Sequence, residues 1–200
     1  MMAKTALLLS GGMDSTCIAY WKRPDVAIAI DYGQKPAIAE LRAANVVAKT
    51  LGIPLEVIQI DCSSLGSGDL AGSEAAGVAP SSEWWPFRNQ LLITMALMAA
   101  IRADVSELMI GTVVSDGSHA DGRPDFVQAI SQVSAMQEGG IRVTAPAIAL
   151  TATELVRQSG IPFDLLGWAH SCHTGNVACG ACRGCNKHRD TYAELGESVY

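Results

Sequence analysis

The stretch of the chain that most constrains the fold lies near the N-terminus, in residues 7–15. Three leucines lead into the sequence Ser-Gly-Gly-Met-Asp-Ser, and residues typical of a helix follow. This pattern predicts a buried strand that ends in a tight turn. The adjacent glycines Gly11 and Gly12 let the backbone adopt conformations closed to other residues and approach a ligand closely. Because the first N–H groups of a helix lack intrahelical partners, they attract anions. The stretch therefore predicts a turn that binds phosphate; the alternative is a glycine-rich turn without a ligand.

The order of residues in this turn separates it from other phosphate-binding loops. It has neither the Gly-x-x-x-x-Gly-Lys-Ser/Thr order of the Walker loop nor the Gly-x-Gly-x-x-Gly order of dinucleotide-binding folds. It resembles the PP-loop of ATP pyrophosphatases and related adenylating enzymes. The resemblance implies ATP as the ligand, together with Mg²⁺, which prefers oxygen ligands. The implied ATP-binding residues are Leu9, Ser10, Gly11, Gly12, Asp14, Ser15, Thr16 and Asp31.

Apolar runs and helical periodicity alternate along most of the chain. Strands are predicted at residues 5–9, 25–30, 54–60, 107–110 and 141–144. Helices are predicted at residues 15–21, 37–51, 126–136 and 151–158, with one more that ends at Arg102. This order predicts an α/β fold of the Rossmann-like PP-loop type, with a parallel sheet of about five strands flanked by helices. Residues 1–165 would form the ATP-binding domain, and residues 166–200 a small segment packed on it. Since ligands bind beyond the carboxyl ends of such strands, Asp31 is expected beside Ser10.

The composition excludes some classes of protein. The chain has 200 residues, of which 49% are hydrophobic, and a formal net charge of −6. The apolar content is ample for one core, whereas the negative charge argues against a protein that coats nucleic acid. The N-terminus lacks the pattern of a signal peptide, and the longest apolar run, residues 91–101, is too short to span a bilayer. We therefore expect a cytoplasmic protein without a membrane segment.

Two loops are candidates for function. Residues 61–83 are rich in Gly, Ser and Ala without periodicity, which is typical of a functional lid or of disorder. The adjacent Trp84 and Trp85 that follow are costly to expose, so we expect them at a ligand face, at an interface or in ordinary core. The second loop, residues 112–126, is polar and follows an apolar strand, a place where chemistry is common. A solvated loop with a helix cap is the alternative for this second loop.

Four of the six cysteines gather near the C-terminus in the pattern C-x6-C-x2-C-x2-C. Closely spaced cysteine pairs with glycine in the turn converge on a tetrahedral zinc ion, and four thiolates leave no open position for catalysis. We therefore predict a structural zinc site. The alternatives are an iron–sulfur cluster, and replacement of one cysteine by His173. The predicted ligands are Cys172, Cys179, Cys182 and Cys185.

The N-terminal turn and the cysteine pattern together resemble the family of 7-cyano-7-deazaguanine synthase, QueC, over nearly the whole chain. Shorter matches lie between them, at residues 31–34, 87–89 and 116–126. The resemblance implies an ATP-dependent ligase that activates the carboxylate of 7-carboxy-7-deazaguanine. Ammonia would then form the amide, and a second activation would give the nitrile of the queuosine pathway. It also implies a homodimer with one structural zinc per subunit.

The resemblance also implies catalytic residues. Arg88 or Arg123 would neutralise the substrate carboxylate or the transition state, and Asp116 would accept N–H groups of the guanine-like edge. One departure concerns the family motif Leu-Thr-Lys, which reads Leu-Thr-Ala here and places Ala152 where the lysine meets the ATP phosphates. Lys35 or Arg142 would have to supply that cation.

This departure keeps two alternatives open. The first is a QueC-like ligase of a phage-defence or modification system, which hands the activated acyl group to an amine on a macromolecule and stops at an amide. Such an enzyme would have a protein acceptor as its partner. The second is a module that binds a nucleotide or deazaguanine without turnover.

Overall fold

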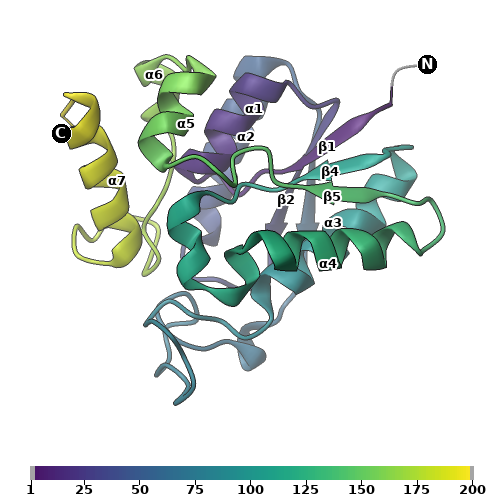
Figure 1. The fold of residues 1–200 in the computed structure, drawn as a ribbon. Coiled ribbons are helices and arrows are strands. Elements are labelled where there is room, and N and C mark those ends of the chain that lie inside the picture. Colours follow the sequence, from purple (N-terminus) through teal and green to yellow (C-terminus); the bar gives the residue numbers. More distant parts are fainter. Residues whose placement is uncertain (1–2, 199–200) are drawn as a thin grey trace.

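The structure, a computed structural model, describes residues 3–198 and contains one sheet of five parallel strands (Figure 1). The strands are ordered β3-β2-β1-β4-β5. This confirms the predicted α/β class and the parallel sheet. The strands are β1 (Thr5–Leu8), β2 (Val26–Asp31), β3 (Leu55–Gln59), β4 (Glu107–Met109) and β5 (Arg142–Thr144).

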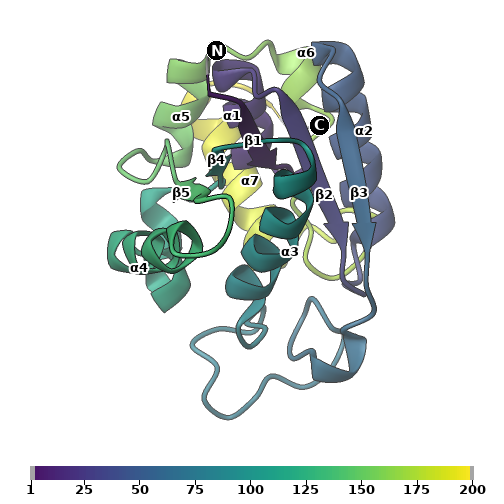
Figure 2. The same cartoon turned by 90° about the vertical axis from the view of Figure 1, so that its right-hand side faces the viewer.

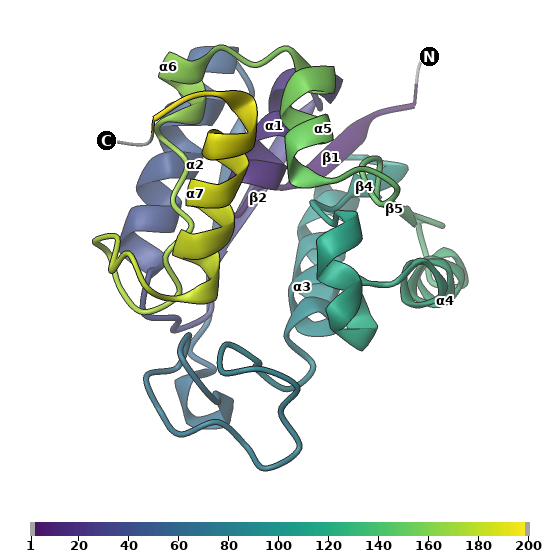
Figure 3. The same cartoon turned by 60° about the vertical axis from the view of Figure 1, so that its left-hand side comes forward.

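Helices cover both faces of the sheet (Figure 3). One face carries α1 (Met13–Lys22), α2 (Ala37–Leu51), α5 (Ala152–Ser159), α6 (Phe163–Leu166) and α7 (Arg183–Leu195). The other face carries α3 (Arg88–Arg102) and α4 (Pro124–Ala135). The predicted strands and helices are present with ends that shift by a few residues, whereas the two C-terminal helices α6 and α7 were not predicted.

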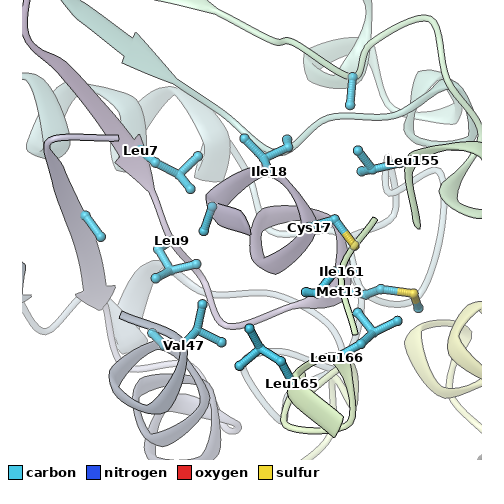
Figure 4. Close-up of a cluster of buried hydrophobic side chains, with 14 of the residues drawn as sticks. Leu7, Leu9, Met13, Cys17, Ile18, Val47, Leu155, Ile161, Leu165 and Leu166 are labelled. Atoms are coloured by element: carbon cyan, nitrogen blue, oxygen red, sulfur yellow. The ribbon is translucent and has the colours of Figure 1, made fainter. Parts of the chain in front are cut away.

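Alternate residues of the central strand supply two separate cores. Leu7 and Leu9 are fully buried under α1 and α2, where they pack with Ile18 and Val47 (Figure 4). Ala6 points the other way, into the core beneath α3 and α4. A strand buried on both faces reads as a continuous apolar run, which is why residues 6–9 show no alternation.

Local signals set the ends of two helices. Helix α2 ends at Gly52, which has a φ of 67°. Helix α5 begins with a capping box, in which the Thr151 hydroxyl accepts the Glu154 N–H at 3.1 Å and the Glu154 carboxylate accepts the Thr151 N–H at 2.8 Å. Both ends agree with the sequence, since glycine tolerates a left-handed conformation and Thr with Glu three residues later caps a helix.

The sheet order places a crevice at the carboxyl ends of β1 and β4. From β1 the strand order runs one way through β2 and β3, and the other way through β4 and β5. The chain that leaves β1 therefore passes to the face that carries α1, and the chain that leaves β4 passes to the face that carries α4. Their divergence leaves a crevice between the two strand ends, which is where such folds bind ligands. The turn in residues 10–16 follows β1 and so lies at this point.

Residues 60–87 form a long loop that projects beyond the carboxyl ends of the strands (Figure 2). Hydrogen bonds within the loop include Asp69 N–H to Ser82 O at 2.8 Å, Ser82 Oγ to Asp69 Oδ2 at 2.7 Å, and Ala76 N–H to Ser67 Oγ at 2.9 Å. The loop also contains a short 3-10 helix, Ser63–Leu65. The loop thus follows a defined path in the structure, and its expected role as a functional lid stays a prediction. Across residues 3–198, no helix has the length and apolar character needed to cross a membrane.

Candidate functional site: a cavity beside the glycine-rich turn

The glycine-rich turn presents a helix start and two hydroxyls to one side. Gly11 has a φ of 79°, and a Cβ there would lie 2.3 Å from the backbone oxygen of Glu40. The Ser10 and Ser15 hydroxyls lie 3.1 Å apart, and Ser15 Oγ also donates to Gly12 O at 3.1 Å. Gly12 precedes α1 and, within the described part of the chain, no side chain caps the helix. The first N–H groups of α1 are thus available to an anion.

A cavity of about 400 Å³ opens beside this turn. Its wall includes the turn, the ends of β2 and β4, the start of α3 and part of the cysteine-rich segment. Gly111 lets β4 approach the turn, because a Cβ there would lie 3.1 Å from the Ser15 nitrogen. The polar and aromatic residues of the wall are Ser10, Asp14, Ser15, Tyr32, Glu40, Glu83, Trp84, Trp85, Arg88, Asn89, Thr112, Ser115, Asp116, His119, Asp121, His170, Ser171, His173, Arg183 and Lys187.

Most of the predicted site residues come together at this cavity. Those that line it are Leu9, Ser10, Gly12, Asp14, Ser15, Arg88 and Asp116. Gly11 packs against α2 instead, and Thr16 is fully buried. Asp31 accepts the Gly33 N–H at 3.0 Å, and Arg123 Nε donates to Gly117 O at 3.0 Å, so both are held by local turns. The functional roles of all these residues stay predictions.

A lysine that was not predicted lies beside the turn. Lys187 of α7 places its Nζ 2.8 Å from Asp14 Oδ2 and 3.2 Å from Asp116 Oδ1. Burial raises the pKa of Asp14 despite this lysine. Burial alone would lower the pKa of Lys187, but the two carboxylates outweigh it and raise that pKa. Lys187 therefore stays charged, and nothing in its local sequence indicates a partner so far away in the chain.

Part of the wall is aromatic. Trp85 is buried and meets the Tyr32 ring edge-on at 5.1 Å between ring centres, while Trp84 lines the cavity. Beneath them, the Gln34 amide donates to Glu40 Oε2 at 2.8 Å. Burial raises the pKa of Glu40 to about 7. This side of the cavity offers a flat apolar surface with a carboxyl group beside it, which suits a flat heterocycle.

An ion-pair network joins the 60–87 loop to the cysteine-rich segment across the cavity. Glu83 Oε1 accepts from Arg183 Nη1 at 2.6 Å and lies 3.1 Å from His119 Nε2. Arg183 Nη2 also donates to Ser118 Oγ at 2.7 Å. Burial would raise the pKa of Glu83, but hydrogen bonds from its own N–H, His119, Ser81 and Arg183 lower it to about 2. The Glu83 carboxylate is thus ionised at neutral pH, and its long-range partners gave no signal in the sequence.

The four C-terminal cysteines converge as predicted. Their Sγ atoms all lie within 4.8 Å of one another. The Cys179 and Cys185 sulfurs are 3.9 Å apart, far more than the ~2 Å of a disulfide bond and close to the spacing of thiolates around zinc. Backbone N–H groups of Cys182 and Cys185 donate to cysteine sulfurs at 3.3 and 3.5 Å. The cluster could therefore bind a metal, and its donor set fits zinc.

Two thiols of this cluster have pKa values that are shifted in opposite directions. The Thr174 hydroxyl and the N–H groups of Ala181 and Cys182 lower the pKa of Cys179 to about 5. Burial raises the pKa of Cys185 to about 12. A bound zinc ion would deprotonate that thiol outright. His173 is not needed as a ligand, because four sulfurs already fill a tetrahedral site.

Comparisons with known proteins identify the relatives of this chain. The family model described as "Queuosine biosynthesis protein QueC" matches residues 4–196. The 7-cyano-7-deazaguanine synthase of Methanoculleus marisnigri is 32% identical, over 98% of this chain and 96% of that protein. The protein of the same name from Nostoc sp. is 33% identical, over 96% and 94%. That from Pseudomonas aeruginosa is 30% identical, over 98% and 96%. With its parallel sheet, its glycine-rich turn and its converging cysteines, the chain belongs to the QueC family.

Proposed function

We propose that this protein is an ATP-dependent ligase that converts 7-carboxy-7-deazaguanine and ammonia into 7-cyano-7-deazaguanine. The observation that carries the proposal is one cavity lined both by the glycine-rich turn, where the start of α1 has no side-chain cap, and by aromatic side chains. Such a cavity holds a nucleotide and a flat carboxylate side by side. The relatives named 7-cyano-7-deazaguanine synthase support the same product.

The chemistry proceeds by two activations. A carboxylate oxygen attacks the α-phosphorus of ATP, pyrophosphate leaves, and the acyl adenylate forms. Ammonia then attacks the carbonyl carbon, which releases AMP and a proton and gives the amide. The amide oxygen attacks the α-phosphorus of a second ATP, pyrophosphate leaves, and loss of AMP and both amide protons leaves the nitrile. Both activations need a site that holds a triphosphate against a second anion or dipole.

Residues of the cavity supply the required contacts. The hydroxyls of Ser10 and Ser15 and the helix start at Gly12 would bind phosphate oxygens. Arg88 at the start of α3 would hold the substrate carboxylate. We prefer Arg88 to Arg123 for this role, because the Arg123 guanidinium is bonded to Gly117 outside the cavity. Asp121 and Trp84 would contact the edge and the face of the heterocycle.

Two metal ions complete the proposal. Asp14 Oδ1 is buried without a hydrogen-bond partner among the residues described, and Asp116 lies across Lys187 from it. The Oδ1 atom of Asp14 would bind Mg²⁺, which would neutralise phosphate charge, while Asp14 Oδ2 and Asp116 hold Lys187. The four cysteines would hold a structural zinc ion, which would fix the fold of the segment that walls the cavity.

The test is a product analysis. Purified zinc-loaded protein receives ATP, Mg²⁺, ammonium and 7-carboxy-7-deazaguanine, and mass spectrometry follows the small molecules. The nitrile with AMP is the expected result. Omission of ammonium should leave the acyl adenylate or no net product.

One observation favours the second candidate, the ligase that acts on a macromolecular amine. Residue 152 is a buried alanine at the first turn of α5, so this helix start offers no lysine to the phosphates. Accumulation of AMP with an amide but no nitrile would support that ligase. Absence of AMP under all these conditions would refute both ligases and leave a binding module.

A further inference from the structure

Three cationic side chains, aside from histidines, line the cavity within residues 3–198, and one of them faces the glycine-rich turn. Arg183 is occupied by Glu83 and Ser118, and Arg88 lies at the start of α3 beside the aromatic wall. Lys187 alone reaches the first turn of α1, through Asp14. The anion site at this turn therefore has one lysine beside it.

The two cations expected from the sequence to meet phosphates lie elsewhere. The Lys35 side chain covers Gly72, where an added Cβ would lie 2.1 Å from Lys35 Cε. Arg142 begins the edge strand β5 and lines a different, shallow depression beside α4. The cation has to come from another part of the chain.

The bonding of Lys187 leaves it able to bind a further oxygen. An ammonium group has three N–H donors. Asp14 and Asp116 use two of them, and the described part of the chain gives no third acceptor. The two carboxylates also fix the position of Nζ, because they hold it from α1 and from the loop after β4. Lys187 lines the same cavity as Ser10 and Ser15.

The cysteine-rich segment determines where Lys187 lies. The lysine follows Cys185 by two residues, and Cys182 caps the start of α7, where its sulfur accepts the Cys185 N–H. The same helix turn packs closely on residues 171–173, since a Cβ on Gly184 would lie 1.8 Å from Ser171 O. His170 N–H donates to Gly11 O at 2.9 Å, which ties this segment directly to the glycine-rich turn.

We propose that Lys187 is the cation that binds the terminal phosphates of ATP and the pyrophosphate leaving group, and that the four-cysteine segment carries it into the site. The proposal rests on the ATP binding proposed above. It assigns the C-terminal segment a direct part in the site in addition to a structural one.

The test measures binding to zinc-loaded protein by isothermal titration calorimetry with Mg²⁺, using ATP, pyrophosphate and AMP. Lys187→Met should weaken ATP and pyrophosphate roughly 10- to 100-fold, the usual effect of losing one charge-assisted hydrogen bond. AMP affinity should change less than about twofold, because AMP lacks the terminal phosphates. Lys187→Arg should recover part of the loss. Lys49→Met, at an exposed position of α2, is the control and should bind all three ligands normally.

Two results would overturn the proposal. One is unchanged ATP and pyrophosphate affinity in Lys187→Met; the other is an equal loss for ATP and AMP, which would mean that Lys187 only neutralises Asp14. Wild-type protein that binds neither ATP nor pyrophosphate would overturn the proposed function as well.

A second measurement needs no variant. Wild-type protein is treated with acetic anhydride, and mass spectrometry follows acetylation at Lys187. Pyrophosphate and ATP should protect this lysine, whereas AMP should not. Equal acetylation with and without pyrophosphate would contradict the assignment even where Lys187→Met fails to fold.

Discussion

Replacement of Gly11 by alanine tests whether close packing of the glycine-rich turn on α2 shapes the site. The backbone at Gly11 has a φ of 79°, and an added Cβ would lie 2.3 Å from Glu40 O and 3.0 Å from the Ala43 Cβ. The positive φ costs about 1 kcal/mol for a residue with a Cβ. Since normal carbon–oxygen contacts exceed 3 Å, the turn or α2 must also move, at a cost of about 1–3 kcal/mol.

The matched control is Gly52→Ala at the other end of α2. Gly52 has a φ of 67°, but a Cβ there meets no atom within 4 Å in the described structure. The Gly52→Ala variant therefore incurs the free-energy cost of the positive φ but not the cost of a steric clash. We expect a loss of about 1 kcal/mol for Gly52→Ala and about 2–4 kcal/mol for Gly11→Ala.

The assay is urea unfolding of zinc-loaded protein followed by tryptophan fluorescence, with ATP affinity measured on the folded variants. In Gly11→Ala, the displaced turn should also weaken ATP binding, whereas Gly52→Ala should bind ATP normally. Equal stability and equal ATP affinity in the two variants would refute the argument from the Glu40 contact.

Three further predictions concern charge and metal. Glu83→Gln should lower the free energy of unfolding by about 2 kcal/mol at pH 7, because folding depresses the Glu83 pKa from 4.5 to about 2. In urea unfolding, the difference in stability between variant and wild type should therefore shrink as the pH falls through this range. A difference that stays constant would contradict the prediction. In steady-state kinetics, Arg88→Met should raise the KM for the carboxylate substrate at least 10-fold. Arg102→Met, at the exposed end of the same helix, should leave this KM unchanged. Equal effects of the two substitutions would argue against a contact between Arg88 and the substrate carboxylate. Cys179→Ser should reduce bound zinc, measured by atomic absorption, and lower the thermal unfolding temperature; unchanged zinc content would exclude the four-cysteine site.

The sequence alone was sufficient for the parts of this protein that depend on local physics. The glycine-rich turn, the limits of α2 and the capping box of α5 follow from residues within a few positions of one another. The cysteine cluster is of the same kind, because its spacing is short enough for four sulfurs to meet whatever the rest of the chain does. Because the glycine-rich turn directly follows the first predicted strand, the sequence also placed the expected phosphate site at the end of β1, whereas the order of the strands came from the structure.

Tertiary structure decided which charged residues enter the cavity. Lys187 meets Asp14 across 173 positions of sequence, and Arg183 meets Glu83 across 100, so neither pair produces a periodicity or a spacing that a reader of the sequence could detect. Conversely, Asp31 and Arg123 stand next to motif residues in the sequence, yet neither lines the cavity, and each forms a hydrogen bond with a nearby backbone group. A strand or a cap is determined by its neighbours in the chain. The partner of a charge is determined by the packing of whole helices and loops, which brings distant segments within hydrogen-bonding distance only after the fold is complete.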